Sequence, residues 1–126
     1  MSVKFAMPDK SCLRKLYRSL LQNLTATVRN SHTKNITNYI KNLDSKNDWK
    51  NIACFCSQDG EPDLSDSINY FQEKGTKVLL PRINKQSGID FHVYEARFGL
   101  ESGPFGIRQP YAGQEKVPKE EIECFL

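Results

Sequence analysis

The stretch that decides the fold runs from Asn51 to Arg82: Asn51-Ile-Ala-Cys-Phe-Cys56, Ser57-Gln-Asp-Gly-Glu-Pro-Asp63, an amphipathic segment, Gly75, and Lys77-Val-Leu-Leu-Pro-Arg82. A short apolar run, a polar turn, a helical pattern and a second apolar run predict a strand–helix–strand unit of a parallel sheet. Ligands of such sheets bind beyond the carboxyl ends of the strands. Glu61 lies in the loop at that edge, so it is the first candidate for a functional residue.

Other elements surround this unit. Regular hydrophobic spacing predicts three helices, over about residues 9–24, 28–43 and 64–74. The third should bury Leu64, Ile68 and Phe71 and end at Gly75 in the left-handed conformation. Alternating apolar and polar residues predict a further strand over 89–94. The Gly- and Pro-rich stretch 98–113 is long for a loop, which indicates a functional segment. Residues 118–126 resemble the approach to another sheet strand, so we expect a missing segment or another chain to pair there.

The length of 126 residues fits one domain, 1–126, with a mainly parallel sheet flanked by helices, an α/β fold. The chain is 38% hydrophobic and 26% charged, which is ordinary for a globular protein. Its net charge of +3 is too mild to argue for nucleic acid, and anionic small ligands are equally compatible with it. We find neither an apolar run of roughly 18 residues, as a membrane span needs, nor a secretory signal. We therefore expect a cytoplasmic protein.

Cysteines and histidines do not predict a metal site. The cysteines stand at positions 12, 54, 56 and 124. Cys54 and Cys56 are expected to face opposite sides of a strand and to act as small buried hydrophobes in a reducing compartment. His32 and His92 lie far apart in the sequence, so we expect neither a metal centre nor a nucleophile–base pair.

Basic residues mark the start of the first predicted helix. Lys10 and Arg14 lie four positions apart, hence on one helix face, and near an N-terminus that also favours anions. Together they could hold a nucleotide phosphate. The alternative is a solvated basic face opposite the leucines, and spacing alone favours that alternative.

Three further side chains each have two interpretations. The carboxylate of Glu61 could accept hydrogen bonds from a heterocycle or amine, or it could help Asp63 to cap the third helix. Arg82, at the same sheet edge, could bind an anion or pair with a carboxylate, and the ion pair is favoured on general grounds. Phe105, between Pro104 and Gly106, could plug the core or form a wall for a flat ring ligand.

Several motifs occur in a family-like order, namely Lys10-Ser-Cys-Leu-Arg14, Glu61-Pro-Asp63, Lys77-Val-Leu-Leu-Pro-Arg82, Phe91 and Gly103-Pro-Phe-Gly-Ile-Arg-Gln-Pro110. This order resembles the 5-formyltetrahydrofolate cyclo-ligase (methenyltetrahydrofolate synthetase) family. The resemblance implies a three-layer fold of the NagB/RpiA-like type. It also implies ATP- and Mg²⁺-dependent closure of 5-formyltetrahydrofolate to 5,10-methenyltetrahydrofolate, releasing ADP and phosphate.

The resemblance also assigns roles to residues. It implies that nucleotide phosphates contact the start of the first helix, Lys10, Ser11, Cys12, Leu13 and Arg14. It implies that the folate contacts a second set, Cys56, Glu61, Arg82, Phe105 and Gly106. Positioning and charge neutralisation supply most of the catalysis in phosphoryl transfer, so no covalent nucleophile is required.

One part of the family pattern has no match in the sequence. The family continues with a further strand and a glycine-rich segment that cradles the ATP phosphates and contributes to Mg²⁺ binding. We therefore expect the 126-residue chain alone to have little or no cyclo-ligase activity. Two alternatives stay open: a non-catalytic folate- or nucleotide-binding module, and a basic domain that binds RNA.

Overall fold

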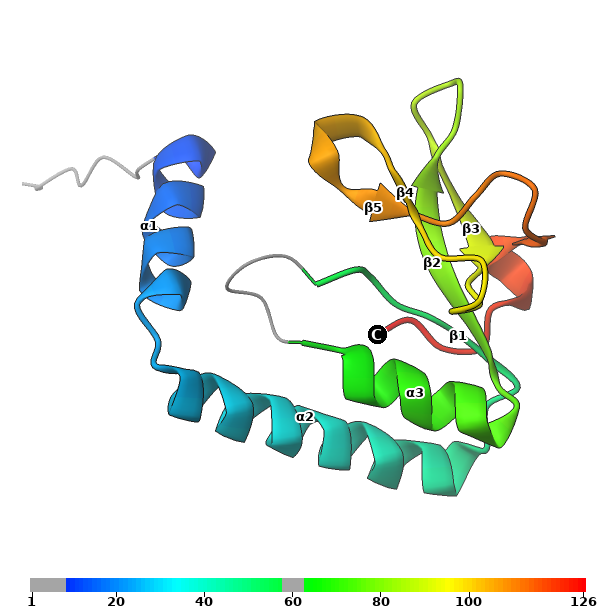
Figure 1. Cartoon of the computed structure of the whole chain (residues 1–126), viewed down its shortest axis with the longest axis horizontal. Helices are drawn as coiled ribbons and strands as arrows, with labels where there is room; N and C mark the ends of the chain where they lie inside the picture. The colour runs from blue at the N-terminus through cyan, green and yellow to red at the C-terminus, as the bar shows by residue number, and fades with distance from the viewer. Residues whose placement is uncertain (1–8, 58–62) are drawn as a thin grey trace, which may run out of the picture.

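The computed structural model describes residues 9–57 and 63–126 (Figure 1). Its three α-helices match the predicted ones closely, and they are α1 (Lys10–Gln22), α2 (Ala26–Asn47) and α3 (Ser65–Lys74). In this described part of the chain, no helix combines the length and the apolar composition that crossing a membrane requires. Glu61 lies outside the described residues, so its place stays a prediction.

The main sheet has four strands in the order β1-β2-β3-β6, namely β1 (Asn51–Ala53), β2 (Lys77–Ile83), β3 (Ile89–Val93) and β6 (Lys116–Val117). β1 and β2 are parallel and are connected through α3, which confirms the strand–helix–strand unit. β3 is antiparallel to both β2 and β6. The α/β class is confirmed, but the expectation of a mainly parallel sheet holds only in part. The short turn at 84–88 joins β2 and β3 as a hairpin, which forces antiparallel pairing.

The last residues add a second parallel contact to β1. The Ala53 N–H donates to the Cys124 carbonyl at 2.8 Å, and the Leu126 N–H donates to the Ala53 carbonyl at 2.9 Å. Ala53 and Phe125 form a parallel bridge, and the Phe125 ring meets Phe91 edge-on with centroids 5.5 Å apart. Residues 118–126 therefore approach the sheet as predicted, but they join it through a single bridge and not as a strand, and their partner there is β1 of the same chain.

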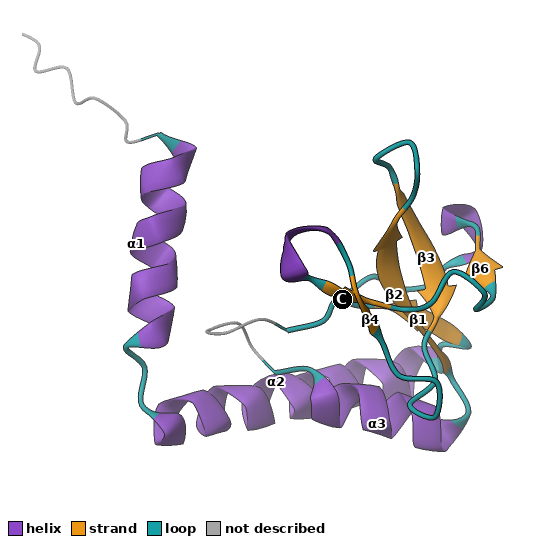
Figure 2. Ribbon diagram, turned by 45° about the horizontal axis from the view of Figure 1, so that its top comes forward, coloured by secondary structure: helices purple, strands orange, loops and turns teal. Residues whose placement is uncertain are grey.

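Side chains fill both faces of the sheet, but unequally. The larger core, here called the helix-side core, lies between the sheet and helices α2 and α3. Its buried members are Ile40, Ile52, Cys54, Leu64, Phe71, Val78 and Leu80. The smaller core lies on the opposite face, and its buried members are Ala53, Leu79, Val93, Val117 and Ile122. Figure 2 shows α2 and α3 together on one side of the sheet. Within the described residues no α-helix covers the opposite face, where Ile122 packs just after the 3₁₀ turn η2 (Lys119–Glu121). The helical third layer expected from the resemblance is therefore not seen in this part of the chain.

Helix α1 stands apart from the sheet in both views (Figures 1 and 2). Its amphipathic pattern is real, because Leu13 is half-buried while the charged side chains are exposed. Leu16 and Leu20, however, are each 55% exposed, and Tyr17 is 61% exposed. The described residues therefore leave most of the apolar face of α1 uncovered.

A buried carboxylate fastens the end of α2 to α3. Asp44 is fully buried, and its oxygens accept hydrogen bonds from the Trp49 N–H at 3.1 Å, from the Tyr70 hydroxyl at 3.0 Å and from the Lys74 ammonium. Lys74 also pairs with Asp48 at 3.0 Å. Burial alone would raise the pKa of Asp44, but these hydrogen bonds together hold it below its ordinary value.

Gly75 ends α3 in the left-handed conformation, as predicted, with φ 89°. Its N–H bonds back to the last turn of the helix. Gly75→Ala should lower the free energy of unfolding by about 1–2 kcal/mol, because a Cβ is disfavoured at this φ even where space is open. Gly113→Ala is the matched control: its site is equally open but not left-handed, so stability should hold or rise slightly. Urea unfolding followed by circular dichroism measures both variants, and equal losses would contradict the argument.

Candidate functional site at the carboxyl edge of the sheet

Two of the predicted substrate residues lie at one edge of the sheet. β1 and β2 are parallel in the register Asn51↔Lys77 to Ala53↔Leu79, so their carboxyl ends share an edge. Cys56 follows β1, and Arg82 is near the end of β2. The edge predicted from sequence is therefore confirmed as the place where these two residues lie.

A small hairpin stands at this edge. It consists of β4 (Glu101–Ser102) and β5 (Arg108–Gln109), joined by the 3₁₀ turn η1 (Pro104–Gly106). The Gly103 N–H donates to the Ile107 carbonyl at 2.7 Å and closes the tip. In Figures 1 and 2 the tip projects from the sheet toward the side of the molecule where α1 stands.

The tip presents an exposed aromatic ring on a strained backbone. Phe105 is 95% exposed and has φ 60°, and Gly106 follows with φ 72°. Its exposure rules out the core-plugging interpretation of Phe105. A left-handed conformation is unfavourable for a phenylalanine by roughly 1–2 kcal/mol. Strain of this kind, at an exposed aromatic side chain, is typical of functional positions.

Arg82 makes an internal ion pair. Its guanidinium Nη1 donates to Glu101 Oε1 and to the Pro110 carbonyl at 2.9 Å. The hydrogen bond from Arg82 holds the pKa of Glu101 below its ordinary range. Of the two roles considered for Arg82, the structure shows pairing with a carboxylate.

Cys56 lies beside the hairpin. It is half-buried and packs against the helix-side core, as does Cys54. The expectation that the two thiols face opposite sides was wrong, because residues two apart in an extended segment share a face. Burial raises the pKa of the Cys56 thiol, and the charge of Arg108 partly offsets this. Burial also raises the pKa of Cys54 to about 12, so both thiols behave as small apolar groups.

Arg108 was not among the predicted site residues. It is exposed on β5, its charge reaches Cys56, and it forms no ion pair with residues in 9–57 or 63–126. Its guanidinium makes a long hydrogen bond, 3.4 Å from Nη2 to the Leu100 carbonyl. The sequence does carry a signal, because Arg108 lies within the Gly103–Pro110 motif. Arg108 therefore offers a positive charge at this edge.

The predicted phosphate site lies on α1. Lys10 and Arg14 are both exposed there. The Cys12 N–H, however, already donates to Asp9 Oδ1 at 2.8 Å. A carboxylate thus occupies part of the helix N-terminus, and any phosphate bound here relies on the Lys10 and Arg14 side chains more than on backbone amides.

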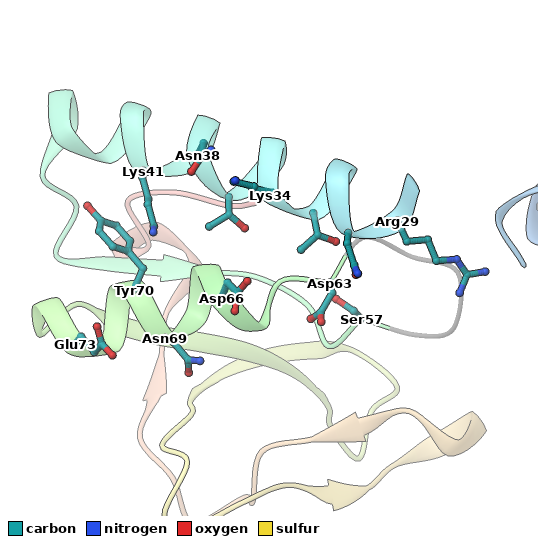
Figure 3. Close-up of a pocket in the computed structure, with 13 residues that line it drawn as sticks. Arg29, Lys34, Asn38, Lys41, Ser57, Asp63, Asp66, Asn69, Tyr70 and Glu73 are labelled. Carbon is teal, nitrogen blue, oxygen red and sulfur yellow. The ribbon is translucent and has the colours of Figure 1, made fainter. Parts of the chain in front are cut away.

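A polar groove of about 990 Å³ separates α2 from α3 (Figure 3) and was not predicted. Its charged lining is mixed: Arg29, Lys34 and Lys41 come from α2, whereas Asp63, Asp66 and Glu73 come from α3 and the residues before it. Lys41 points toward the Tyr70 ring, with 5.3 Å from Nζ to the ring centroid. Because positive and negative side chains line it in equal number, the groove has no evident preference for an anionic or a cationic ligand.

Asp63 has the structural role that the sequence predicted for it. Its Oδ1 accepts hydrogen bonds from the Ser65 N–H at 2.9 Å and the Ser65 hydroxyl at 2.6 Å, which lowers the pKa of Asp63. The Ser57 hydroxyl accepts from the Leu64 N–H at 3.1 Å. These bonds define the start of α3 and connect it to Ser57, the last described residue before Glu61.

Comparison with known proteins decides the family. A model of the 5-formyltetrahydrofolate cyclo-ligase family matches residues 6–124. The chain belongs to this family. A comparison with curated proteins found no match.

Two solved structures resemble this cyclo-ligase family member. A 5,10-methenyltetrahydrofolate synthetase from Aquifex aeolicus is 26% identical with a TM-score of 0.77, and the match covers 92% of this chain and 58% of that one. A 5,10-methenyltetrahydrofolate synthetase from Mycoplasma pneumoniae is 18% identical with a TM-score of 0.66, over 94% and 62% of the two chains. The second likeness concerns the fold alone. The chain spans only about three-fifths of either structure.

The family resemblance implies Mg²⁺, so the described residues were compared with the ligands that a metal ion needs. Within the described residues, no group of three or more His, Cys, Asp or Glu side chains could hold a metal ion. The described part of the chain therefore holds no protein cage for the Mg²⁺ that the sequence resemblance implies, and nucleotide phosphates would have to supply most of its ligands.

Proposed function

We propose that this chain supplies the folate-binding part of an ATP-dependent 5-formyltetrahydrofolate cyclo-ligase, which forms 5,10-methenyltetrahydrofolate. The observation that carries the proposal is the carboxyl edge of the sheet. There a half-buried Cys56 adjoins a hairpin with an exposed, strained Phe105, in a chain that belongs to the cyclo-ligase family. Such an edge is where ligands of open α/β sheets bind.

The chemistry of this edge suits a reduced folate. The Phe105 ring, with Gly106 beside it, offers a face on which a flat pterin can stack. Cys56 contributes an apolar wall, and Arg108 a cation for the carboxylates of the glutamate tail. We place Glu61 in the same site, with its carboxylate accepting hydrogen bonds from the pterin or the reacting amide.

The phosphate side of the reaction belongs to α1. ATP would supply the phosphoryl group that activates the formyl oxygen. Lys10 and Arg14 would neutralise phosphate charge, with Ser11, Cys12 and Leu13 forming the adjacent helix surface. Further Mg²⁺ ligands would come from outside the described residues.

We further propose that the chain on its own binds folate but turns it over poorly. It spans about three-fifths of the two solved synthetases, and the part of the fold that it does not cover, on the same polypeptide or on a second chain, would complete the phosphate side of the site. A second candidate function is a non-catalytic folate- or nucleotide-binding module in the cytoplasm. Binding of RNA is less favoured, because the net charge is only +3.

Calorimetric titration of the chain with 5-formyltetrahydrofolate tests the proposal. Binding is expected, and Phe105→Asn should weaken it about tenfold, because one stacked ring contributes roughly 1.4 kcal/mol. Asparagine tolerates the left-handed backbone, so the fold should not suffer. Phe98→Asn is the matched control, since Phe98 is an exposed ring, 47% exposed, outside the hairpin.

The outcomes separate the candidate functions. Binding without ATP-dependent formation of 5,10-methenyltetrahydrofolate selects the binding module, and binding with turnover selects the complete enzyme. No binding of the folate, together with steeply salt-dependent binding of RNA, would overturn the proposal in favour of an RNA-binding domain. An equal loss in Phe98→Asn and Phe105→Asn would remove Phe105 from the site.

A further inference from the structure

The β4–β5 hairpin is too small to hold its own position. Each of its strands has two residues, Glu101–Ser102 and Arg108–Gln109. An isolated two-stranded hairpin is marginally stable at best, even when its strands are longer. The direction of its tip must therefore depend on how the hairpin is attached to the rest of the chain. Two apolar residues flank the hairpin, Leu100 against the helix-side core and the fully buried Pro110.

The polar part of the attachment is concentrated at the end of β2. Val78, Leu80 and Arg82 alternate onto one face of β2, and the first two are buried in the helix-side core. Arg82 continues this row beyond the core. Its guanidinium donates hydrogen bonds to the Glu101 carboxylate on β4 and to the carbonyl of Pro110, just after β5. One guanidinium thus holds the hairpin at both of its ends.

The buried side chain of Gln109 also connects the hairpin to β2. It is only 7% exposed, its Oε1 accepts from the Ile83 N–H at 3.4 Å, and its Nε2 lies 3.5 Å from Glu101 Oε1. A Cβ built on Gly103 would lie 2.6 Å from the Gln109 side chain, so the glycine lets this side chain pass under the turn. The carboxylate of Glu101 therefore receives both Arg82 and Gln109.

We propose that Arg82 and Glu101 are positioning residues, whose ion pair fixes the direction of the hairpin so that Phe105 faces the folate. This proposal rests on the proposed function, because it needs a ligand for Phe105 to meet. It changes the role of Arg82 from a ligand of the substrate to a support for the hairpin. It also gives a role to Glu101, which neither the motifs nor the family comparison assigns.

A double-mutant cycle tests the proposal in the full chain. Glu101→Gln keeps the shape of the side chain and removes its charge, and it should weaken binding of 5-formyltetrahydrofolate about tenfold. In the Phe105→Asn background the same change should have less than a roughly twofold effect, because the contact that it positions is already gone. A general loss of structure would not produce this non-additivity. Glu115→Gln, which removes the exposed Lys77–Glu115 pair, is the matched control and should leave affinity unchanged.

Amide hydrogen exchange tests, without any ligand, whether the Arg82–Glu101 pair fixes the hairpin. The amides of Gly103 and Ile83 should exchange about tenfold faster in Glu101→Gln, while Leu80, in the core part of β2, keeps its protection. If the unmodified chain binds no folate, the proposed function fails, and this measurement still shows whether the pair fixes the hairpin. If folate binds, and Glu101→Gln is neutral or is additive with Phe105→Asn, the positioning role is overturned.

Discussion

Phe71→Ala should lower the free energy of unfolding by about 3–5 kcal/mol, the largest effect that we expect from one substitution. Phe71 is 0% exposed and lies between α3 and the sheet. Its ring meets Tyr70 edge-on with centroids 5.1 Å apart and Trp49 at 6.4 Å. Removing it opens a cavity that the strand–helix–strand unit cannot collapse into, because β1, β2 and α3 all border it. Domains of this size are stable by only about 5–15 kcal/mol, so part of the population should unfold.

Tyr39→Ala is the control for this prediction. Tyr39 is also an aromatic residue on a helix that packs against the sheet, but it is 64% exposed. Its removal should change stability by less than about 0.5 kcal/mol. Urea unfolding monitored by circular dichroism gives both values without relying on Trp49 fluorescence, which Phe71→Ala would itself perturb. Equal losses in the two variants would show that the helix-side core is not the centre of stability.

Local patterns in the sequence were enough to predict most of the elements. Hydrophobic spacing located α1, α2 and α3, a short apolar run located β2, and alternation located β3. Gly75 was predicted as the left-handed end of α3, and Phe71 as part of its buried face. Both predictions depend on contacts within a few residues, which are what periodicity and turn chemistry record.

Contacts between distant residues could not be predicted in this way. Glu101, the partner of Arg82, stands 19 residues further along the chain. The Asp44–Lys74 pair spans 30 residues and joins two helices whose packing no local pattern specifies. The exposure of the leucines on α1 was equally hidden, because an amphipathic pattern says which face is apolar and not what covers it.

For the candidate site, too, local patterns predicted one part and contacts between distant residues determine the other. Its location followed from the parallel pairing of β1 and β2, which a strand–helix–strand pattern does predict. Its chemistry depends on how the hairpin is turned, and that depends on Arg82, Gln109 and Pro110, whose contacts all cross between elements. For this reason the motif identified Phe105 but not the residues that hold it in place.

Asp44→Asn should lower the free energy of unfolding at pH 7 by about 3 kcal/mol, because a fully buried carboxylate that receives Lys74, Tyr70 and the Trp49 N–H is replaced by a neutral amide. The folded state lowers the pKa of Asp44, so its contribution is complete above the unfolded-state pKa of about 3.9 and disappears as the pH falls through the lower native value. Stability of the unmodified chain should therefore fall steeply below about pH 4. That of Asp44→Asn should fall less over the same range.

Asp48→Asn separates burial from charge in this prediction. Asp48 pairs with the same Lys74 ammonium at 3.0 Å, but its side chain is 68% exposed. Water screens such a pair, so Asp48→Asn should change stability little at pH 7 and leave most of the acid-sensitive step in place. Urea unfolding at a series of pH values between about 2.5 and 7 measures all three chains. Should Asp44→Asn keep the acid-sensitive step of the unmodified chain, the step belongs to other carboxylates. The α2–α3 junction would then owe its stability to the apolar packing around Phe71 and not to the buried charge.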